Sequence, residues 1–349
     1  MSDASNKSQV GNGNLSTLKF DPEFTPGARN AVRVCLRIQP QEKVTLITDR
    51  ATQEIAASLI HEIKAVGAPC RAWILEEIES RPLRDMPRVI LEDLESSNVS
   101  LFVVQAQLNE LGSRMQMTEV VNRRRIRHAH MVNINRQIML EGMRADFQKV
   151  DEISTRVLEM LTGASHIRAR TPAGTDLEGE FIRDFRWVKT SGIISPEKWG
   201  NLPGGEVFTT PALVNGTFVV DGVVGDYLCA RYGNLAGEPL TLRIRDSRLM
   251  EVHSENRKLE DEFWQYTHTD ENSDRVGEFA IGTNIELKHV IGQILQDEKF
   301  PGVHIAFGNP YGEHTGADWY SSTHIDVVGT RFSIWLDDRQ IMQEGKFQI

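Results

Sequence analysis

The stretch KVTLITD at residues 43–49, followed by RATQEIAASLIHEIKAVG at residues 50–67, sets the fold of the first half of the chain. The first segment is a short, mostly apolar run rich in β-branched residues, which is typical of a buried strand. In the second segment, apolar side chains recur at helical spacing until Gly67, and glycine commonly follows the last turn of a helix. The pair therefore predicts a strand that leads directly into a helix.

The same alternation continues along the first half of the sequence. Further strands are expected at residues 71–75, 99–104 and 130–134, and helices at residues 87–94, after Thr118 and at residues 146–161. Strands that alternate with helices at this spacing favour a parallel sheet covered by helices on both faces. We therefore expect an α/β domain with a parallel sheet in the first half.

The second half has a different pattern, in which strands dominate. Residues 240–245 alternate between apolar and polar side chains, and Val219 and Val220 precede the turn pair Asp221-Gly222. The length of 349 residues suits about two domains. The expected organisation is a disordered tail at residues 1–18, an α/β domain at residues 19–163 and a β-rich α+β domain at residues 164–349.

Composition and charge exclude several classes of protein. With 40% hydrophobic and 25% charged residues the chain is typical of globular proteins, which argues against a fibrous or wholly disordered chain. The net charge of -10 has the wrong sign for binding the phosphates of nucleic acid. No apolar stretch approaches the ~20 residues that a membrane-spanning helix needs, and the first residues lack the apolar core of a secretion signal. We expect a cytoplasmic protein that binds neither nucleic acid nor membranes.

The first half shows no catalytic motif. The turn after residues 43–49 reads Arg50-Ala51-Thr52 and lacks the glycines that would cradle a dinucleotide pyrophosphate. The basic run RRRIRH at residues 123–128 is interpreted as a solvated helix face. The 3 cysteines are scattered outside any C-x-x-C pair, so no thiolate metal site is expected.

Candidate metal ligands gather in the second half. In the strand-like motif THID at residues 323–326, His324 and Asp326 are two residues apart and leave the same face. This spacing alone is a weak signal, because surface ion pairs produce it too. Residues 303–308, VHIAFG, place His304 in an apolar strand, where a histidine is more often a hydrogen-bonded core residue than a metal ligand.

Two glutamates add to these histidines. Glu278, in GEFAIG at residues 277–282, shares a strand face with Ala280 and lies opposite two large apolar residues. Burying an ionised carboxylate on such a strand is costly unless it is paired with a cation or bound to a metal. Glu206, in NLPGGEVF at residues 201–208, leads into a further apolar strand, and its ordinary interpretation is a solvated residue at the strand entry.

Taken together, five residues match one kind of site. The set offers hard oxygen and borderline nitrogen ligands suited to two divalent ions, and its members are Glu206, Glu278, His304, His324 and Asp326. Three negative ligands against two dipositive ions leave about one net positive charge, which favours binding water as hydroxide near neutral pH. The set therefore predicts a hydrolytic metal centre.

The motifs that contain these residues resemble the aminopeptidase T and aminopeptidase S group of metallopeptidases. The similar stretches are, in order, NLPGGEVFTTP (201–211), VGEFAIGTN (276–284), DEKFPGVHIAFGNPYG (297–312) and STHIDVV (322–328). The resemblance implies that the five residues bind a pair of divalent metals and that Tyr311 assists catalysis. It also implies a homodimer that acts on a peptide or small-molecule substrate.

The activity implied by this resemblance is that of a hydrolase, an aminopeptidase that removes the N-terminal residue of a peptide. As a hypothesis, a metal-activated water attacks the scissile carbonyl, Glu278 bridges the two metals and Tyr311 stabilises the oxyanion. Glu206 is expected to bind one metal or to serve as general base. Carboxylate and imidazole ligands accept zinc, cobalt and manganese alike, so the metal is left open.

A related branch of the family gives an alternative. The chain has about the length of the dihydroxypyridine ring-opening dioxygenases, in which Fe(II) is held by two histidines and an aspartate, a ligand set suited to oxygen chemistry. The first of those histidines corresponds to Glu278, and glutamate at this position, together with Glu206, favours the peptidase-like site. A binding or assembly protein that has lost catalysis is a third alternative, against which the full set of ligands and Tyr311 argue.

Overall fold

The computed structural model describes residues 15–107, 109–197 and 199–349, and contacts divide this part of the chain into two units. The first unit contains the described residues up to Gln148 together with Gly192–Gly204, and the second contains Lys149–Ser191 and Gly205–Ile349. Residue 163, where the sequence places the domain boundary, is the last residue of a helix that starts at Phe147. Most of the expected tail, residues 1–14, lies outside the described residues.

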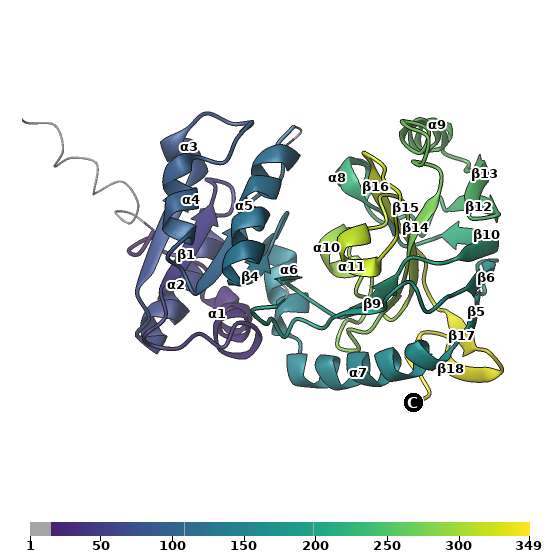
Figure 1. The fold of residues 1–349 in the computed structure, drawn as a ribbon, viewed down its shortest axis with the longest axis horizontal. Coiled ribbons are helices and arrows are strands. Elements are labelled where there is room, and N and C mark those ends of the chain that lie inside the picture. The colour runs from purple at the N-terminus through teal and green to yellow at the C-terminus, as the bar shows by residue number, and fades with distance from the viewer. Residues whose placement is uncertain (1–14, 108, 198) are drawn as a thin grey trace, which may run out of the picture. The chain divides into compact units, whose positions relative to one another are not determined.

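The first unit is built on a five-stranded sheet with the order β2-β1-β3-β4-β8, in which every pairing is parallel. Its elements (Figure 1) are η1 (Pro22–Phe24), α1 (Thr25–Arg29), η2 (Asn30–Cys35), β1 (Val44–Thr48), α2 (Gln53–Val66), β2 (Cys70–Ile74), α3 (Leu75–Ile78), α4 (Arg88–Leu94), β3 (Val99–Val103), α5 (Leu111–Arg124), β4 (Arg127–His130), α6 (Arg136–Leu140), η3 (Gly142–Arg144) and β8 (Gly200–Asn201). The parallel α/β sheet expected from the sequence is confirmed.

The first strand and helix follow the sequence closely. All residues of β1 are buried, as its apolar run predicts. Helix α2 ends where Gly67 takes a left-handed conformation with φ 89°, which a residue without a side chain adopts freely. Helices α4 and α5 pack over one face of the sheet, where they contact Ile47, Trp73 and Phe102.

Two elements of this unit differ in extent from the expectation. Helix α5 begins at Leu111 rather than after Thr118, because its first turns carry mostly polar or small side chains that hide the helical period. Strand β4 covers Arg127–His130 rather than residues 130–134. Polar residues in a buried strand conceal its pattern, and here His128 is accommodated by a polar partner, Ser100.

Burial holds two histidines of β4 in the neutral form. His128 Nδ1 lies 2.8 Å from Ser100 Oγ, and His128 Nε2 lies 3.1 Å from His130 Nδ1. Burial lowers the pKa of His128 to about 3 and the pKa of His130 well below its ordinary value. Among the residues that the structure describes, no carboxylate offsets this burial by favouring the charged form of either imidazole.

We expect these histidines to make the protein less stable in acid. Below a pH of about 6.5, the ordinary histidine pKa, the unfolded chain takes up protons that the native state excludes, so the free energy of unfolding falls as the pH drops. Each linked proton contributes up to about 1.4 kcal/mol per pH unit. Calorimetric melting at pH 7, 6 and 5 measures the effect. The double variant His128→Gln, His130→Phe should show a shallower pH dependence, and an unchanged slope would contradict this account.

The second unit consists of two antiparallel sheets packed face to face. The eight-stranded sheet has the order β13-β12-β10-β6-β5-β17-β18-β19, and the six-stranded sheet has the order β11-β16-β15-β14-β9-β7. The elements are α7 (Phe147–Gly163), β5 (His166–Arg170), β6 (Asp176–Glu180), β7 (Val188–Thr190), β9 (Glu206–Thr209), β10 (Leu213–Val220), β11 (Val223–Val224), α8 (Asp226–Tyr232), β12 (Leu240–Arg245), β13 (Arg248–His253), α9 (Arg257–Tyr266), β14 (Val276–Gly282), α10 (Ile294–Asp297), β15 (Gly302–Gly308), α11 (Gly312–Thr315), β16 (His324–Val328), β17 (Ser333–Leu336), β18 (Arg339–Gln343) and β19 (Lys346–Phe347). The expected β-rich second half is confirmed.

The two faces of the six-stranded sheet have different environments. Phe279, Ile305 and Ile325 point into the core shared with the eight-stranded sheet. Because side chains alternate along a strand, their even-numbered neighbours point to the opposite face. Figure 1 shows α8, α10 and α11 on that opposite side of β14, β15 and β16, away from β10 and β12.

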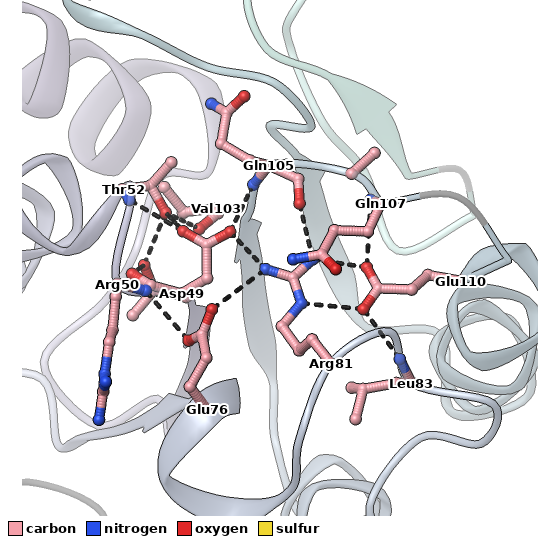
Figure 2. A network of polar contacts seen from close by, with 12 residues as sticks. Asp49, Arg50, Thr52, Glu76, Arg81, Leu83, Val103, Gln105, Gln107 and Glu110 are labelled. Atoms are coloured by element: carbon pink, nitrogen blue, oxygen red, sulfur yellow. Dashed lines mark hydrogen bonds and ion pairs between the residues drawn. The ribbon is translucent and has the colours of Figure 1, made fainter. Parts of the chain in front are cut away.

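In the first unit, an ion-pair network fills the place where open α/β sheets usually bind ligands (Figure 2). That place is the carboxyl edge of the sheet between β1 and β3, where the strand order reverses. The guanidinium of Arg81 lies there, 2.7 Å from Asp49 Oδ2 and 2.5 Å from Glu110 Oε2, and it donates to the Gln105 carbonyl at 2.6 Å. The protein's own cation therefore takes the position of a ligand at this edge.

Candidate metal centre

Adjacent strands place the five candidate ligands on the face of the six-stranded sheet that points away from the core. Strands β9, β14, β15 and β16 are neighbours in this sheet. Glu278 on β14 is in register with Ala306 on β15, which is in register with Asp326 on β16. The two carboxylates thus stand on either side of an alanine, about 10 Å apart at their backbones. The methyl group of Ala306 leaves the space above it to the longer side chains.

A β-bulge at Gly277 separates Glu278, on this face, from Val276, in the core. Val276 pairs with Phe307, a core residue, whereas Glu278 pairs with Ala306, so the register shifts between the two. In regular alternation Val276 and Glu278 would share a face, but Val276 lies in the core. A side chain at Gly277 would meet the Gly308 carbonyl at 2.4 Å, so this tight bulge requires glycine. The sequence pattern did not predict it.

Three of the candidate ligands form a compact group. One atom each from Glu206, Glu278 and His304 lie within 4.8 Å of one another. His304 Nε2 is 3.5 Å from Glu206 Oε2 and 3.4 Å from Glu278 Oε1. Ligand atoms about 2 Å from a zinc ion in tetrahedral geometry are separated by distances of about this size.

The other two candidate ligands lie on the far side of Glu278. His324 Nε2 is 3.6 Å from Asp326 Oδ1 and 3.9 Å from Glu278 Oε2. The two oxygens of Glu278 therefore face different histidines, Oε1 toward His304 and Oε2 toward His324. The structure brings all five predicted residues together, with Glu278 in the middle.

Two observations show that the donor set fits a divalent metal. His304 Nε2 is buried and has no hydrogen-bond partner within the described residues, which is unusual for a polar atom in a core. His324 Nδ1 lies 2.8 Å from the Asn309 carbonyl, which only accepts, so Nδ1 carries the hydrogen. In the neutral ring this leaves the lone pair on His324 Nε2 for a metal, and a backbone partner of this kind is common behind metal-bound histidines.

The electrostatics of the cluster also suit a cation. Burial disfavours a charged imidazole, but the surrounding carboxylates outweigh burial and raise the pKa of His304 to about 10 and that of His324 to about 9. Without a metal, the carboxylates thus retain protons on both rings. A divalent ion would replace these protons, so metal affinity is expected to fall in acid.

Tyr311 lies beside the second half of the cluster. Its ring centroid is 4.4 Å from that of His324, and the side chain is 44% exposed. The backbone N–H of Tyr311 donates to Asn309 Oδ1 at 2.9 Å, and the carbonyl of Asn309 contacts His324. Asn309 therefore fixes the tyrosine backbone and the histidine ring relative to each other.

Two residues of the site were not predicted from the sequence. The side chain of Lys299 is 1% exposed, and its Nζ lies 2.7 Å from Glu206 Oε1 and 2.5 Å from Glu298 Oε1. Burial would lower the pKa of Lys299, but these two carboxylates outweigh it and raise the pKa. For Glu298, burial is the main cause of a pKa raised to about 8. Charged residues before a strand are usually solvated, so DEK at residues 297–299, although part of a stretch similar to the family, did not indicate site residues.

The position of Lys299 depends on a glycine in the sheet. Gly282 pairs with Glu206, and a side chain at Gly282 would meet the Phe300 carbonyl at 2.0 Å. The segment that follows α10 therefore passes directly over β14. This close approach of two backbones delivers the lysine to Glu206.

We expect the small residue between the carboxylates to be essential for metal binding. Ala306→Leu would fill the space above the strand without changing any ligand, and it should weaken metal affinity at least tenfold, or by about 1.4 kcal/mol. Titration of the metal-free variant with zinc measures the affinity. Ile305→Val, on the core face of the same strand, is the matched control and should lose some stability but no metal affinity. Unchanged metal binding by Ala306→Leu would contradict the proposed location of the metal.

The six-stranded sheet carries a buried carboxylate–imidazole cluster with the donor atoms of a metal site, and comparison of the sequence with known families gives the class of protein. The sequence pattern of the thermophilic metalloprotease (M29) family matches residues 129–344, so the chain belongs to this family. The resemblance expected from the sequence is thereby confirmed, and family membership supports a metallopeptidase with a divalent metal. No match is found among curated proteins.

Solved structures include two relatives of similar fold. The structure of 2,5-dihydroxypyridine dioxygenase from Pseudomonas putida KT2440 has a TM-score of 0.69 at 14% identity, covering 93% of this chain and 96% of that chain. Wild-type AmpT from Thermus thermophilus has a TM-score of 0.68 at 16% identity, covering 94% of this chain and 99% of that chain. Both likenesses show the fold alone. Each alignment spans nearly the whole of both chains, so chain length does not separate the two branches.

Proposed function

We propose that the protein is a metal-dependent aminopeptidase, with a centre for two divalent ions formed by Glu206, Glu278, His304, His324 and Asp326. The observation that supports this proposal is the position of Glu278, whose two oxygens face two different histidines. A carboxylate in this position can serve two ions at once. The alternative dioxygenase site has a histidine where this chain has Glu278, so the residues favour the hydrolase.

The chain's own residues have distinct roles in the proposed reaction. Bound divalent ions supply Lewis acidity and make water a nucleophile near neutral pH. Tyr311 is exposed beside His324, where its hydroxyl can donate to the oxyanion that forms on the scissile carbonyl. The cluster of carboxylates also attracts the free amine of a peptide, which supports removal of the first residue.

Glu298 is a second candidate for the general base beside Glu206. Glu206 Oε1 already accepts from Thr190 Oγ1 and Lys299 Nζ, both at 2.7 Å, and Glu206 Oε2 faces His304. Lys299 Nζ contacts both Glu298 and Glu206, and burial raises the pKa of Glu298 to about 8. A base with a pKa near the working pH accepts a proton and releases it again efficiently.

The proposed setting of the enzyme follows from the sequence rather than the fold. Within the described residues no helix has the length and apolar character needed to cross a bilayer. The cytoplasmic location and the homodimer stay predictions. The peptide substrate is supported by family membership, and its preferred side chain is left to experiment.

The proposal is tested by metal analysis of the isolated protein combined with a substrate screen. Aminoacyl anilides and short peptides would be incubated with and without a chelator, and with added zinc, cobalt or manganese. We expect bound divalent metal and chelator-sensitive release of free amino acids. Oxygen uptake that depends on Fe(II) and a dihydroxypyridine, without peptide hydrolysis, would overturn the proposal in favour of the dioxygenase alternative.

A further inference from the structure

We propose that Lys299 is a built-in cation that makes the two halves of the metal centre unequal. One divalent ion binds tightly in the half formed by Glu278, His324 and Asp326. The half formed by Glu206 and His304 binds its ion at least tenfold more weakly. This inference rests on the proposed metal-dependent function and adds a specific loading order to it.

The contacts of Glu206 support the inference. Glu206 Oε1 accepts two hydrogen bonds, from Thr190 Oγ1 and from Lys299 Nζ, each at 2.7 Å. Both lone pairs of Glu206 Oε1 are therefore occupied by hydrogen bonds. The other oxygen, Oε2, faces His304 Nε2 at 3.5 Å. Glu206 is therefore limited to a single oxygen as a metal ligand, and part of its negative charge is offset by the lysine.

The lysine is held firmly in this position. Its side chain is 1% exposed, and its second contact is Glu298 Oε1 at 2.5 Å. The backbone on either side is fixed as well, because Asn284 N–H donates to the Lys299 carbonyl at 3.0 Å and Gly282 allows the segment to pass over β14. A buried ammonium is stable only when it is paired, and Lys299 would lose both carboxylate contacts if its side chain moved to solvent.

The charges of the two halves differ as a result. A divalent ion bound between Glu206 and His304 would lie close to a fixed ammonium, and like charges repel strongly in a buried site. On the other side, Asp326 forms its ion pair with His324 rather than with a lysine or arginine among the described residues. The distances alone would favour tighter metal binding in the Glu206 half, where the ligand atoms lie closer together. The ammonium reverses this preference, because a charge at short range outweighs small differences in ligand spacing.

Metal titration of the metal-free protein tests the inference without relying on activity. Cobalt(II) binding would be followed by calorimetry and by its visible absorption. We expect one tight ion and a second ion bound at least tenfold more weakly. Lys299→Met and Lys299→Gln should bind two ions with affinities within about threefold of each other, whereas Lys299→Arg should keep the difference. Two neutral variants are used so that a folding defect in one leaves the other as the test.

Further variants identify which half binds the tight ion. Thr190→Val removes the neutral donor from the same Glu206 oxygen and should leave the tenfold difference in place. Asp326→Asn should lose the tight ion, and Glu206→Gln should keep it. Two ions of equal affinity in the unmodified protein, or a persistent difference in both neutral variants, would overturn the inference while leaving the aminopeptidase proposal intact. Failure to bind any divalent ion would instead overturn the proposed function and the inference with it.

Discussion

Glu278→Gln is expected to abolish catalysis while leaving the fold intact. Glutamine has nearly the same shape as glutamate, but it lacks the charge and replaces one oxygen by an amide that does not bind metal. Because the two oxygens of Glu278 face His304 and His324, this change removes a ligand from both halves of the centre at once. We expect kcat/KM to fall at least about 1000-fold, which corresponds to about 4 kcal/mol of transition-state stabilisation. The measurement is the hydrolysis of an aminoacyl anilide, with metal content determined in parallel.

A control separates this effect from a general loss of structure. Glu251→Gln makes the same chemical change at an exposed position on β13, in the same unit of the protein. It should leave activity, metal content and melting temperature within experimental error. Since Glu278 is a buried carboxylate, its neutral variant should melt at or above the temperature of the unmodified metal-free protein. Full activity of Glu278→Gln would refute the assignment of this residue.

Strand periodicity explains why the candidate site could be predicted from the sequence. The alternation in residues 277–282, 303–308 and 323–326 correctly predicted which side chains share a face, and the antiparallel register then brings those faces together. Because alternate positions are fixed by the geometry of an extended chain, a short motif is enough to predict them. The parallel sheet of the first unit was predicted for the same reason, from buried apolar runs that alternate with helices.

Features that depend on contacts distant in sequence were not predicted. The bulge at Gly277 exists because the Gly308 carbonyl lies against it, and Lys299 reaches Glu206 because Gly282 lets another segment pass. The same holds for Gly192–Gly204, which returns to the first unit and adds β8 beside β4. Such contacts join segments far apart in the chain, so local sequence patterns do not predict them.

Arg81→Met is expected to destabilise the first unit more than any exposed substitution. The side chains of Arg81, Asp49 and Glu110 are each at most 4% exposed. Removing the guanidinium leaves two buried carboxylates without their cation, a change that typically costs about 3–5 kcal/mol. Glu76 Oε1, 3.4 Å from Arg81 Nη1, adds a third carboxylate to the network (Figure 2). The expected result is a large drop in the free energy of unfolding, measured by urea denaturation and by hydrogen exchange of the β1 and β3 amides.

The cause of the lost stability can be identified by also neutralising the carboxylates that Arg81→Met leaves unpaired. The triple variant Arg81→Met, Asp49→Asn, Glu110→Gln should recover part of the stability, because neutral amides are less costly to bury than unpaired carboxylates. Burial by itself raises the pKa of Glu110, and Arg81 is the main group that holds it low. In Arg81→Met the native state should therefore take up a proton, as the pH falls, that the unfolded state does not yet bind. The difference in free energy of unfolding between this variant and the unmodified protein should then become smaller from pH 7 to pH 5.

Arg88→Met, at a 91% exposed arginine, is the matched control and should change stability by less than about 1 kcal/mol. If Arg81→Met lowered the free energy of unfolding no more than this control, the ion-pair network would contribute little to the stability of the first unit. A loss of several kcal/mol in the free energy of unfolding would instead show that the stability of the first unit depends on Arg81. A ligand that bound at the carboxyl edge of this sheet would have to displace this arginine, which explains why the protein's own cation occupies the edge.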